Sequence, residues 1–242
     1  FDMVSLHMSY QTPIFAHFLS PITNTRTDRY GGSLENRARF PLEACRRIRE
    51  ACGEDFLIEV QISGDEAEGG FTVEDLVAFA KLAEGTVDIL QLRAADVDLA
   101  HPTGFNSVPH QPVTLQYAKI IKNSGVKILA APCGGYQDLE DSNRWIAEGS
   151  CDMVAMARAF ICDPDYGQKA MEGRGEDVVP CIRCDRCHGI SRTGPWLSVC
   201  SVNPRLGLEH RLERMIFAPK KQKKVAVIGG GPAGMKAALV AA

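Results

Sequence analysis

The sequence is short of several features that would each point to a particular partner. It has no apolar run near the ~20 residues that a membrane-spanning helix needs. It has no strong charge of one sign, because 27 Lys and Arg face 30 Asp and Glu for a formal net charge of −3. Its first residues do not form a signal peptide, and it has no internal repeats or low-complexity tracts. We therefore expect neither a membrane nor a nucleic acid as a partner.

The cysteines do not form the even-numbered set of a disulfide framework. There are nine, and five lie scattered in apolar or helical contexts, as is typical of reduced core thiols: Cys45, Cys52, Cys133, Cys151 and Cys162. Reduced thiols are kept in reducing compartments. We therefore expect a cytoplasmic protein.

The other four cysteines have the spacing of a metal or cluster site. They read C-x2-C-x2-C-x12-C and are Cys181, Cys184, Cys187 and Cys200. Four thiolates suit either an iron–sulfur cluster or tetrahedral zinc. A zinc site more often has two separated C-x2-C pairs, so this spacing and the following Pro204 favour a [4Fe–4S] cluster. Zinc and unliganded thiols remain the alternatives.

Short apolar segments alternate with helical patterns over the first two thirds of the chain. Buried strands are predicted at Val4–Leu6, Leu57–Ile62, Val87–Leu92, Val126–Ala131 and Met153–Met156. Helices are predicted between and after them at Ser33–Cys52, Thr72–Glu84, Gln116–Asn123 and Leu139–Glu148, with Ser33 and Thr72 as N-caps. This α/β order predicts a parallel sheet, either doubly wound or part of a (β/α)8 TIM barrel. A whole barrel needs ~250 residues and only about 165 precede the cysteines, so a barrel would be present as its C-terminal half, strands 4–8.

A second strand–turn–helix pattern ends the chain. Residues 211–224 are polar and basic and predict a solvated linker. Lys224–Ile228 predicts a buried strand that runs into G-x-G-x-x-G, formed by Gly229, Gly231 and Gly234. In such a motif the glycines allow a tight turn, close approach of a pyrophosphate and close packing of helix on strand. It predicts the start of a Rossmann-like domain for FAD or NAD(P)H, without deciding between them.

The domain plan that follows has four parts: 1–168, a partial barrel; 169–210, the cysteine segment; 211–224, the linker; and 225–242, the start of a nucleotide-binding domain. The chain opens at Phe1 without an initiator Met and stops inside a predicted helix. We therefore expect a fragment of a longer protein.

Residues 18–40 carry a family resemblance. They read Phe18-Leu19-Ser20-Pro21, then Asn24-x-Arg26-Thr27-Asp28-x-Tyr30-Gly31-Gly32-Ser33-Leu34-Glu35-Asn36-Arg37-Ala38-Arg39-Phe40, which resembles the old yellow enzyme family of NADH:flavin oxidoreductases. The cysteine quartet, Asn203-Pro204 and the glycine motif resemble its multidomain iron–sulfur branch, which includes 2,4-dienoyl-CoA reductase, 2-enoate reductases, trimethylamine dehydrogenase and bile-acid 7-dehydroxylation flavin oxidoreductases. The resemblance implies a barrel that binds FMN, a [4Fe–4S] cluster beside it, and a C-terminal FAD and NAD(P)H module.

The same resemblance assigns residues to the FMN site. Gly134 and Gly135 fall on the family's phosphate loop, and Ala157 and Arg158 on its phosphate-binding Arg segment. Phosphate sites in barrels do form from the loops after strands 7 and 8. Gln61 stands where the family usually has an Arg near flavin N1 and O2, so the reduced flavin loses a cation unless Arg93 or another cation replaces it. We expect Gln61→Arg to raise the FMN potential.

Three residues are implied as catalytic. His7 ends the first strand, where a barrel has its active face, and could polarise a substrate carbonyl. Tyr10 is a candidate general acid. His101 aligns with a second acid of the dienoyl-CoA reductases. The loop Met8–Pro13 is one residue longer than the family pattern, which indicates a different substrate loop.

The leading interpretation is an NAD(P)H-dependent ene-reductase that transfers hydride from FMN to an activated C=C bond of an enoate, enoyl-CoA or steroid enone. The alternatives are an amine dehydrogenase of the trimethylamine dehydrogenase type, and a non-catalytic redox subunit. The sequence leaves open which small unsaturated molecule is the substrate, whether NADH or NADPH is the electron donor, and whether the protein is a homo-oligomer.

We also expect the isolated 242-residue chain to be poorly soluble, because five strands cannot close an eight-stranded barrel.

Overall fold

The computed structural model describes residues 1–10, 13–94, 113–184, 186–188, 198–215 and 221–242. The chain divides into two compact units, Phe1–Pro204 and Arg205–Ala242. Each unit is described by itself.

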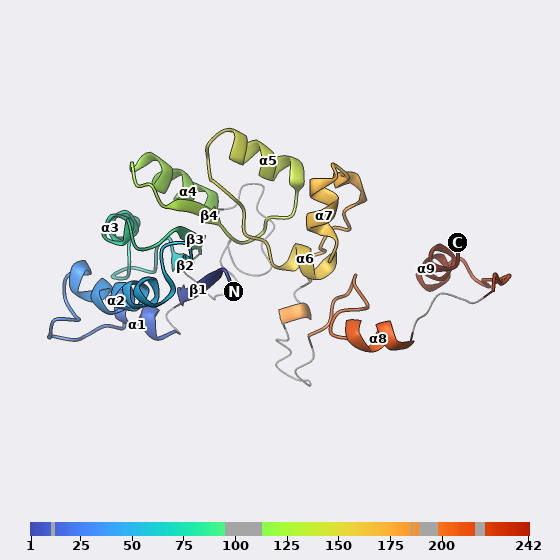
Figure 1. The fold of residues 1–242 in the computed structure, drawn as a ribbon, viewed down its shortest axis with the longest axis horizontal. Helices are drawn as coiled ribbons and strands as arrows, with labels where there is room; N and C mark the ends of the chain where they lie inside the picture. The colour runs from blue at the N-terminus through green and yellow to red at the C-terminus, as the bar shows by residue number, and fades with distance from the viewer. Residues whose placement is uncertain (11–12, 95–112, 185, 189–197, 216–220) are drawn as a thin grey trace. The chain divides into compact units, whose positions relative to one another are not determined.

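The first unit is built on a parallel sheet. Its strands are β1 (Met3–Met8), β2 (Leu57–Ser63), β3 (Ile89–Arg93) and β4 (Leu129–Pro132), hydrogen-bonded in the order β1-β2-β3-β4. Helices α2 (Leu34–Cys52), α3 (Val73–Ala83) and α4 (Val113–Asn123) connect them, and α5 (Leu139–Ala147) follows β4. Figure 1 shows these helices on the outer side of a curved row of strands. These four strands and four helices confirm the sequence prediction.

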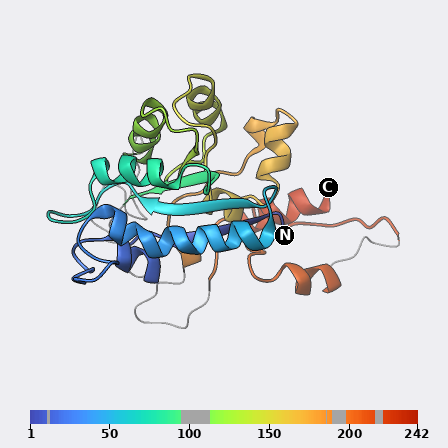
Figure 2. The ribbon, with the colours of Figure 1, turned by 60° about the vertical axis from the view of Figure 1, so that its left-hand side comes forward.

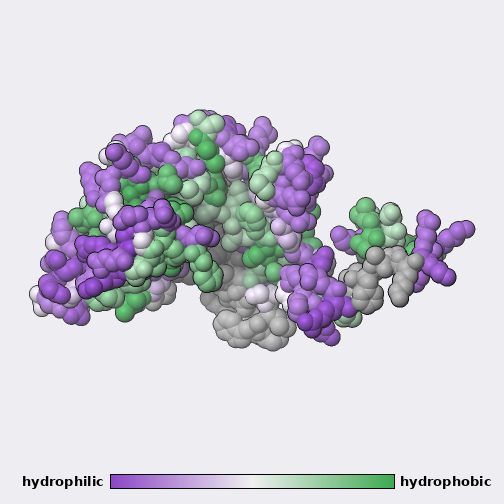
Figure 3. All heavy atoms as spheres, viewed as in Figure 1, coloured by the Kyte–Doolittle hydropathy of each residue, from purple (hydrophilic) through white to green (hydrophobic). Residues whose placement is uncertain are grey.

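The core lies between the sheet and its helices. One face of the strands is apolar and buried, with Leu6, Met8, Val60, Ile62, Leu90 and Leu92 packed in one cluster with residues of α2, α3 and α4. Figure 2 shows α2 running alongside the strands. The caps form as predicted: Ser33 Oγ accepts from Asn36 N, and Thr72 Oγ1 accepts from Asp75 N. Figure 3 shows mostly hydrophilic residues over the outer helices of this unit.

The fifth predicted strand, Met153–Met156, does not become a full strand. Asp152 N donates to Ala130 O and Ala155 N donates to Pro132 O, both at 3.0 Å, but only a single parallel bridge, Cys133↔Ala155, results. Pro132 has no N–H to continue the ladder. The segment therefore runs beside β4 without a regular strand.

Helix α1 (Ile14–Leu19), which sequence patterning did not predict, is held by a buried arginine. Arg37 of α2 donates through Nε to Gly32 O at 3.1 Å and through Nη1 to Leu19 O. Its Nη2 lies 3.3 Å from the Asp75 carboxylate of α3. One guanidinium thus joins α1, the loop before α2, and α3.

Short elements complete the first unit. They are α6 (Arg158–Cys162), α7 (Tyr166–Met171), and the 3-10 turns η1 (Gly175–Asp177) and η2 (Arg186–His188). Asp163, at the end of α6, accepts from Lys169 Nζ at 2.7 Å and from Val179 N at 2.8 Å. This buried carboxylate ties the segment that leads to the cysteines back to α6.

The described residues of the second unit contain the helices α8 (Glu209–Met215) and α9 (Pro232–Ala241). Helix α8 begins at the end of the predicted cysteine segment and runs into the predicted linker, and nearly all its residues are exposed. The predicted buried strand before the glycine motif is wrong for this chain, because residues 221–230 form no strand and Ile228 is 99% exposed. A strand needs a neighbour to pair with, and none is present among the described residues of this unit. No helix in the described part of the chain combines the length and apolar character needed to cross a bilayer.

Candidate active site

The inner face of the sheet is polar where the outer face is apolar. Alternation along each strand puts Ser5 and His7 of β1, Glu59 and Gln61 of β2, and Gln91 and Arg93 of β3 on this face. The register pairs His7 with Gln61 and Gln61 with Gln91. The side chains of three neighbouring strands therefore meet near the carboxyl ends of the strands.

Arg93 is the centre of this polar group. Its Nη1 donates to Gln61 Oε1 at 2.7 Å and to Gln91 Oε1 at 3.3 Å, and its Nε donates to Tyr10 Oη at 2.7 Å. Gln61 Nε2 then donates to Ser5 Oγ at 2.9 Å. The guanidinium is thus fixed by contacts to β2, to β3 and to the loop after β1.

A buried carboxylate lies on the same face. Glu59 is 8% exposed and accepts a hydrogen bond from Gln91 Nε2. Burial raises the pKa of Glu59, while hydrogen bonds from Ser5 and Gln91 and the charge of Arg93 oppose the rise. Gln91 therefore bridges a carboxylate and a guanidinium in the barrel interior.

His7 lies near the end of β1, and Tyr10 follows in the loop after it. Their rings are 5.5 Å apart. Burial lowers the pKa of His7, and the nearby charge of Arg93 lowers it further, so the imidazole is neutral at pH 7. Ser9 N lies 3.5 Å from His7 Nδ1, which favours the tautomer with the proton on Nε2. His7 can then donate a hydrogen bond without carrying charge.

The loop after β4 contains two glycines with a left-handed backbone. Gly134 and Gly135 have φ of 113° and 81°, values that favour glycine. Ala157 and Arg158 begin α6, directly after the bridge at Ala155. Burial raises the pKa of the Cys133 thiol, and the charges of Arg93 and Arg158 oppose this, so both guanidiniums lie within electrostatic range of this loop. These residues fit the phosphate end of a flavin mononucleotide.

The predicted cluster cysteines receive backbone hydrogen bonds. Arg183 N donates to Cys181 Sγ at 3.4 Å, and Asn203 N donates to Cys200 Sγ at 3.2 Å. Cys184 Sγ donates to Ser201 Oγ at 3.3 Å. Amide donors to sulfur stabilise a thiolate, which is the ligand form of cysteine, so these contacts suit Cys181 and Cys200 as ligands.

The four thiols are not assembled into a site in this structure. Within the residues described, no three His, Cys, Asp or Glu side chains are close enough to hold a metal ion. Residues 185 and 189–197, which lie between the cysteines, are outside the described part. The four-thiolate site therefore stays a prediction.

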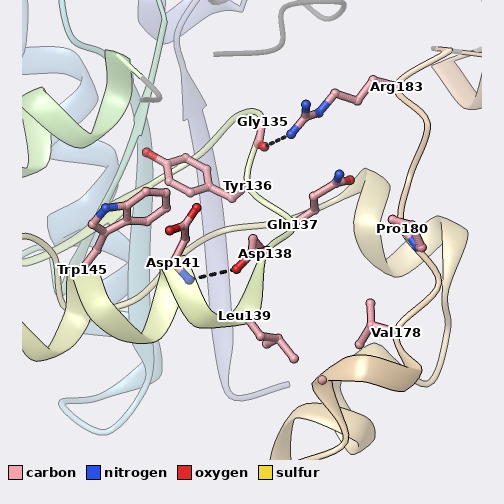
Figure 4. A pocket seen from close by; sticks show the side chains of 11 residues that line it. Gly135, Tyr136, Gln137, Asp138, Leu139, Asp141, Trp145, Val178, Pro180 and Arg183 are labelled. Carbon is pink, nitrogen blue, oxygen red and sulfur yellow. Dashed lines mark hydrogen bonds between the residues drawn. The ribbon is translucent and has the colours of Figure 1, made fainter. Parts of the chain in front are cut away.

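The cysteine segment contacts the glycine loop. Arg183 has a left-handed backbone with φ of 55°, and its Nη2 donates to Gly135 O at 3.0 Å. Figure 4 shows this contact at the edge of a pocket of about 300 Å³. The pocket lies between residues 135–138, the first turns of α5, and the segment 175–183. Asp138 there accepts from Asp141 N at 2.9 Å and caps α5.

The glycine motif of the second unit has the local geometry that its sequence predicts. Gly229 has φ of 107°, as the tight turn requires. A Cβ on Gly234 would lie 2.0 Å from Gly229 O, whereas one on Gly231 would meet nothing within 4 Å. Gly231 caps α9 and Pro232 is its first residue. The turn and helix fit a dinucleotide, although the strand before them is not formed.

His101 lies outside the described residues, so its predicted role is not tested. Glu59 and Gln91 were missed as site residues. Their signal was the alternation of polar and apolar residues along β2 and β3, which puts them on the same face as Gln61 and Arg93.

A model of the NADH:flavin oxidoreductase / NADH oxidase family matches residues 1–177. The chain is 42% identical over 250 residues to a NADH oxidase of Thermoanaerobacter brockii, which covers 100% of this chain and 37% of that protein. It is 32% identical to a cinnamate reductase of Clostridium sporogenes over 100% of this chain and 38% of that protein. The chain thus spans little more than a third of the length of these relatives.

Two solved structures resemble this chain in fold. A 2-naphthoyl-CoA reductase in complex with 2-naphthoyl-CoA superposes with a TM-score of 0.85 at 32% identity, covering 98% of this chain and 36% of that one. A histamine dehydrogenase from Rhizobium sp. 4-9 superposes with a TM-score of 0.74 at 31% identity, covering 86% and 30%. The predicted fold class is confirmed: the parallel α/β sheet of the first unit is part of a (β/α)8 barrel.

Proposed function

Because this chain belongs to the NADH:flavin oxidoreductase / NADH oxidase family, we propose that the full-length protein reduces a C=C bond conjugated to a carbonyl or carboxylate, with NAD(P)H as the electron source. The observation that carries this proposal is the cation Arg93 beside two proton donors, Tyr10 and His7, at the carboxyl ends of the strands. An enoate, an enoyl-CoA thioester and a steroid enone all present an oxygen that gains negative charge as hydride adds to the β-carbon.

Electrostatics separates this substrate class from amines. Arg93 donates to two neutral amides and a phenol, and the carboxylate of Glu59 is linked to it through Gln91. A cationic substrate about 6 Å from the guanidinium would be repelled by roughly 3 kcal/mol at an effective dielectric constant of 20. The same term favours a carboxylate or a developing oxyanion by a similar amount. The site therefore suits acyl substrates better than protonated amines.

The side chains have separate tasks in this proposal. His7, neutral and protonated on Nε2, donates a hydrogen bond to the substrate oxygen and holds charge that develops there. Tyr10 gives a proton to the carbon next to the carbonyl. Arg93 adds the positive potential that favours the charged transition state over the neutral substrate.

The cofactors are proposed from the residues that would hold them. Gly134, Gly135, Ala157 and Arg158 would bind the FMN phosphate, and Gln61 lies on the inner face that would receive the flavin ring. When bound, FMN supplies hydride transfer, which the side chains of a protein cannot perform themselves. The four cysteines would hold a [4Fe–4S] cluster for single-electron transfer, and the glycine motif at 229–234 would take part in binding FAD or NAD(P)H.

The test uses the full-length protein, purified without oxygen. Flavins are extracted and identified, and iron, sulfide and zinc are measured. Cinnamate, an aromatic enoyl-CoA and a steroid enone are then assayed with NADH and NADPH, and dimethylamine and histamine with an artificial electron acceptor. FMN, FAD, about four irons per chain and reduction of an unsaturated acyl substrate support the proposal. Zinc in place of iron, or amine oxidation without alkene reduction, overturns it.

The second candidate is an amine dehydrogenase. The observation in its favour is the similarity to the histamine dehydrogenase structure. An Arg93→Gln variant separates the two candidates, because losing the cation should weaken turnover of an acyl substrate and strengthen binding of an amine. A non-catalytic redox subunit would bind the flavin and turn over neither class.

A further inference from the structure

Tyr10 has a backbone that a tyrosine rarely adopts. Its φ is 69°, in the left-handed region, where a bulky residue outside glycine is an outlier. Such a conformation costs on the order of 1–3 kcal/mol and persists only where the surroundings hold it. The conformation therefore needs a partner that fixes the side chain.

Arg93 is that partner. Its Nε lies 2.7 Å from Tyr10 Oη, and its guanidinium carbon lies 4.8 Å from the centre of the Tyr10 ring. The guanidinium cannot swing away freely, because its Nη1 also donates to Gln61 and Gln91. Two strands therefore hold the group that holds Tyr10.

The direction of the Tyr10 hydrogen bond is fixed by chemistry. A guanidinium has five N–H donors and no acceptor, so the phenol oxygen must be the acceptor in its contact with Arg93. The phenol O–H cannot point at Arg93 and is left to donate to another group. Without Arg93, the phenol could accept from or donate to whichever neighbour is near.

We propose that Arg93 is the positioning residue that makes Tyr10 a proton donor in this site, fixing both the place of its oxygen and the direction of its O–H. This inference rests on the proposed function for the step it serves, but the contact itself can be tested without turnover. Arg93 also adds charge. Burial raises the pKa of Tyr10 and the Arg93 charge lowers it, so the arginine keeps the phenol a stronger acid than burial alone would.

The groups that face Tyr10 could shift the pKa of its phenol. They are His7 of β1, Arg93 of β3 and Cys133 after β4, and Glu59 of β2 acts on Arg93 and Cys133. His7 is neutral at pH 7, and burial keeps the Cys133 thiol protonated. Arg93 is therefore the charge on the described residues that bears most directly on the phenol.

The experiment uses the full-length holoprotein with Arg93→Gln, Arg93→Lys, Tyr10→Phe, and the double variant Arg93→Gln/Tyr10→Phe. Arg47→Gln serves as the matched control, because Arg47 is exposed and on the outer helix α2. Ultraviolet difference titration, with Tyr10→Phe subtracted, reports the phenol of Tyr10 alone. We expect its titration to move to higher pH in Arg93→Gln, to stay near the wild-type position in Arg93→Lys, and to be unchanged in Arg47→Gln.

Kinetics separates positioning from charge. We expect Tyr10→Phe and Arg93→Gln each to lower kcat roughly 100-fold, the typical contribution of a positioned acid, and the double variant to lose far less than the product of the two, with only the direct effect of the Arg93 charge on the substrate added to the loss from Tyr10→Phe. Arg93→Lys keeps the charge but not the planar fork, so it should keep the titration and still lose most of kcat. If Arg93→Gln costs as much in the Tyr10→Phe background as in the wild type, or leaves the Tyr10 titration unmoved, the inference is wrong. If the titration moves but no alkene is reduced by any variant or by the wild type, the positioning stands and the proposed reaction falls.

Discussion

Replacing the buried Arg37 should release the segment that follows the catalytic loop. Arg37 is 6% exposed and makes two charged hydrogen bonds to the carbonyls of Gly32 and Leu19, each worth roughly 1.5 kcal/mol at the low end for charged donors. Its ion pair with Asp75, which is partly exposed at 3.3 Å, adds about 1 kcal/mol. Arg37→Leu should therefore destabilise this region by about 4 kcal/mol. This corresponds to an equilibrium constant for local opening that is roughly 700-fold larger.

Hydrogen–deuterium exchange on the full-length protein measures this effect where it should occur. Amides of α1 and of the loop before α2 should exchange roughly 700-fold faster in Arg37→Leu and about fivefold faster in Asp75→Asn, which removes only the ion pair. Arg47 lies on the same helix and pairs with Glu50 at 3.7 Å on the exposed surface. Arg47→Leu should therefore change the exchange rates very little. If Arg37→Leu behaves like Arg47→Leu, the buried guanidinium does not hold these elements together.

Three further outcomes are expected. Burial alone would raise the pKa of Asp163, but Lys169 Nζ at 2.7 Å and the hydrogen bonds from Val179 N and Asp165 N together outweigh burial and hold the pKa below its usual value. The stabilisation from this carboxylate is therefore full above about pH 4 and is lost as pH falls through the folded pKa. Thermal melts should show Asp163→Asn less stable than wild type at pH 7 and equal to it in strong acid. Gly134→Ala should reduce FMN binding roughly tenfold in a titration of the flavin-free protein, because its φ of 113° strains any residue with a Cβ by about 1–3 kcal/mol; an unchanged affinity would remove Gly134 from the site. Gln61→Arg should raise the FMN potential more than Gln61→Arg combined with Arg93→Gln, because the single variant adds a cation near the reduced flavin whereas the double variant gains one cation and loses the other; potentiometry showing equal rises would count against Arg93 as the compensating cation.

The strands and outer helices were predictable because their signals are local. A two-residue period with apolar residues on one face marks β2 and β3, and a Ser or Thr cap marks where α2 and α3 begin. Elements that depend on a distant partner were not predictable in this way. Helix α1 is held by Arg37, eighteen residues after Leu19. The residues before Gly229 form no strand and have no strand beside them within the described part of their unit.

The site was predictable in part for the same reason. His7, Tyr10 and Gln61 were assigned by family resemblance, and the structure brings all three near Arg93. The alternation Leu90-Gln91-Leu92-Arg93 shows that Gln91 and Arg93 share a face. It does not show what they touch, because that depends on the register between strands. Only the pairing of Gln61 with Gln91 puts Arg93 next to Gln61 and turns separate polar residues into one hydrogen-bonded group.

If the cysteines bind a cluster and the loop after β4 binds a phosphate as proposed, the contact of Arg183 with Gly135 would make these two binding events thermodynamically dependent on each other. Arg183 lies between Cys181 and Cys184, and its guanidinium reaches the loop that would bind a phosphate. Whatever immobilises the cysteine segment also restrains that loop, and the reverse holds through the same bond. Linkage requires the two effects to be equal: the factor by which an occupied cysteine site tightens phosphate binding is the factor by which bound phosphate tightens the cysteine site. If each bound group orders the segment that it contacts, the protein would fill both sites together more readily than either one alone.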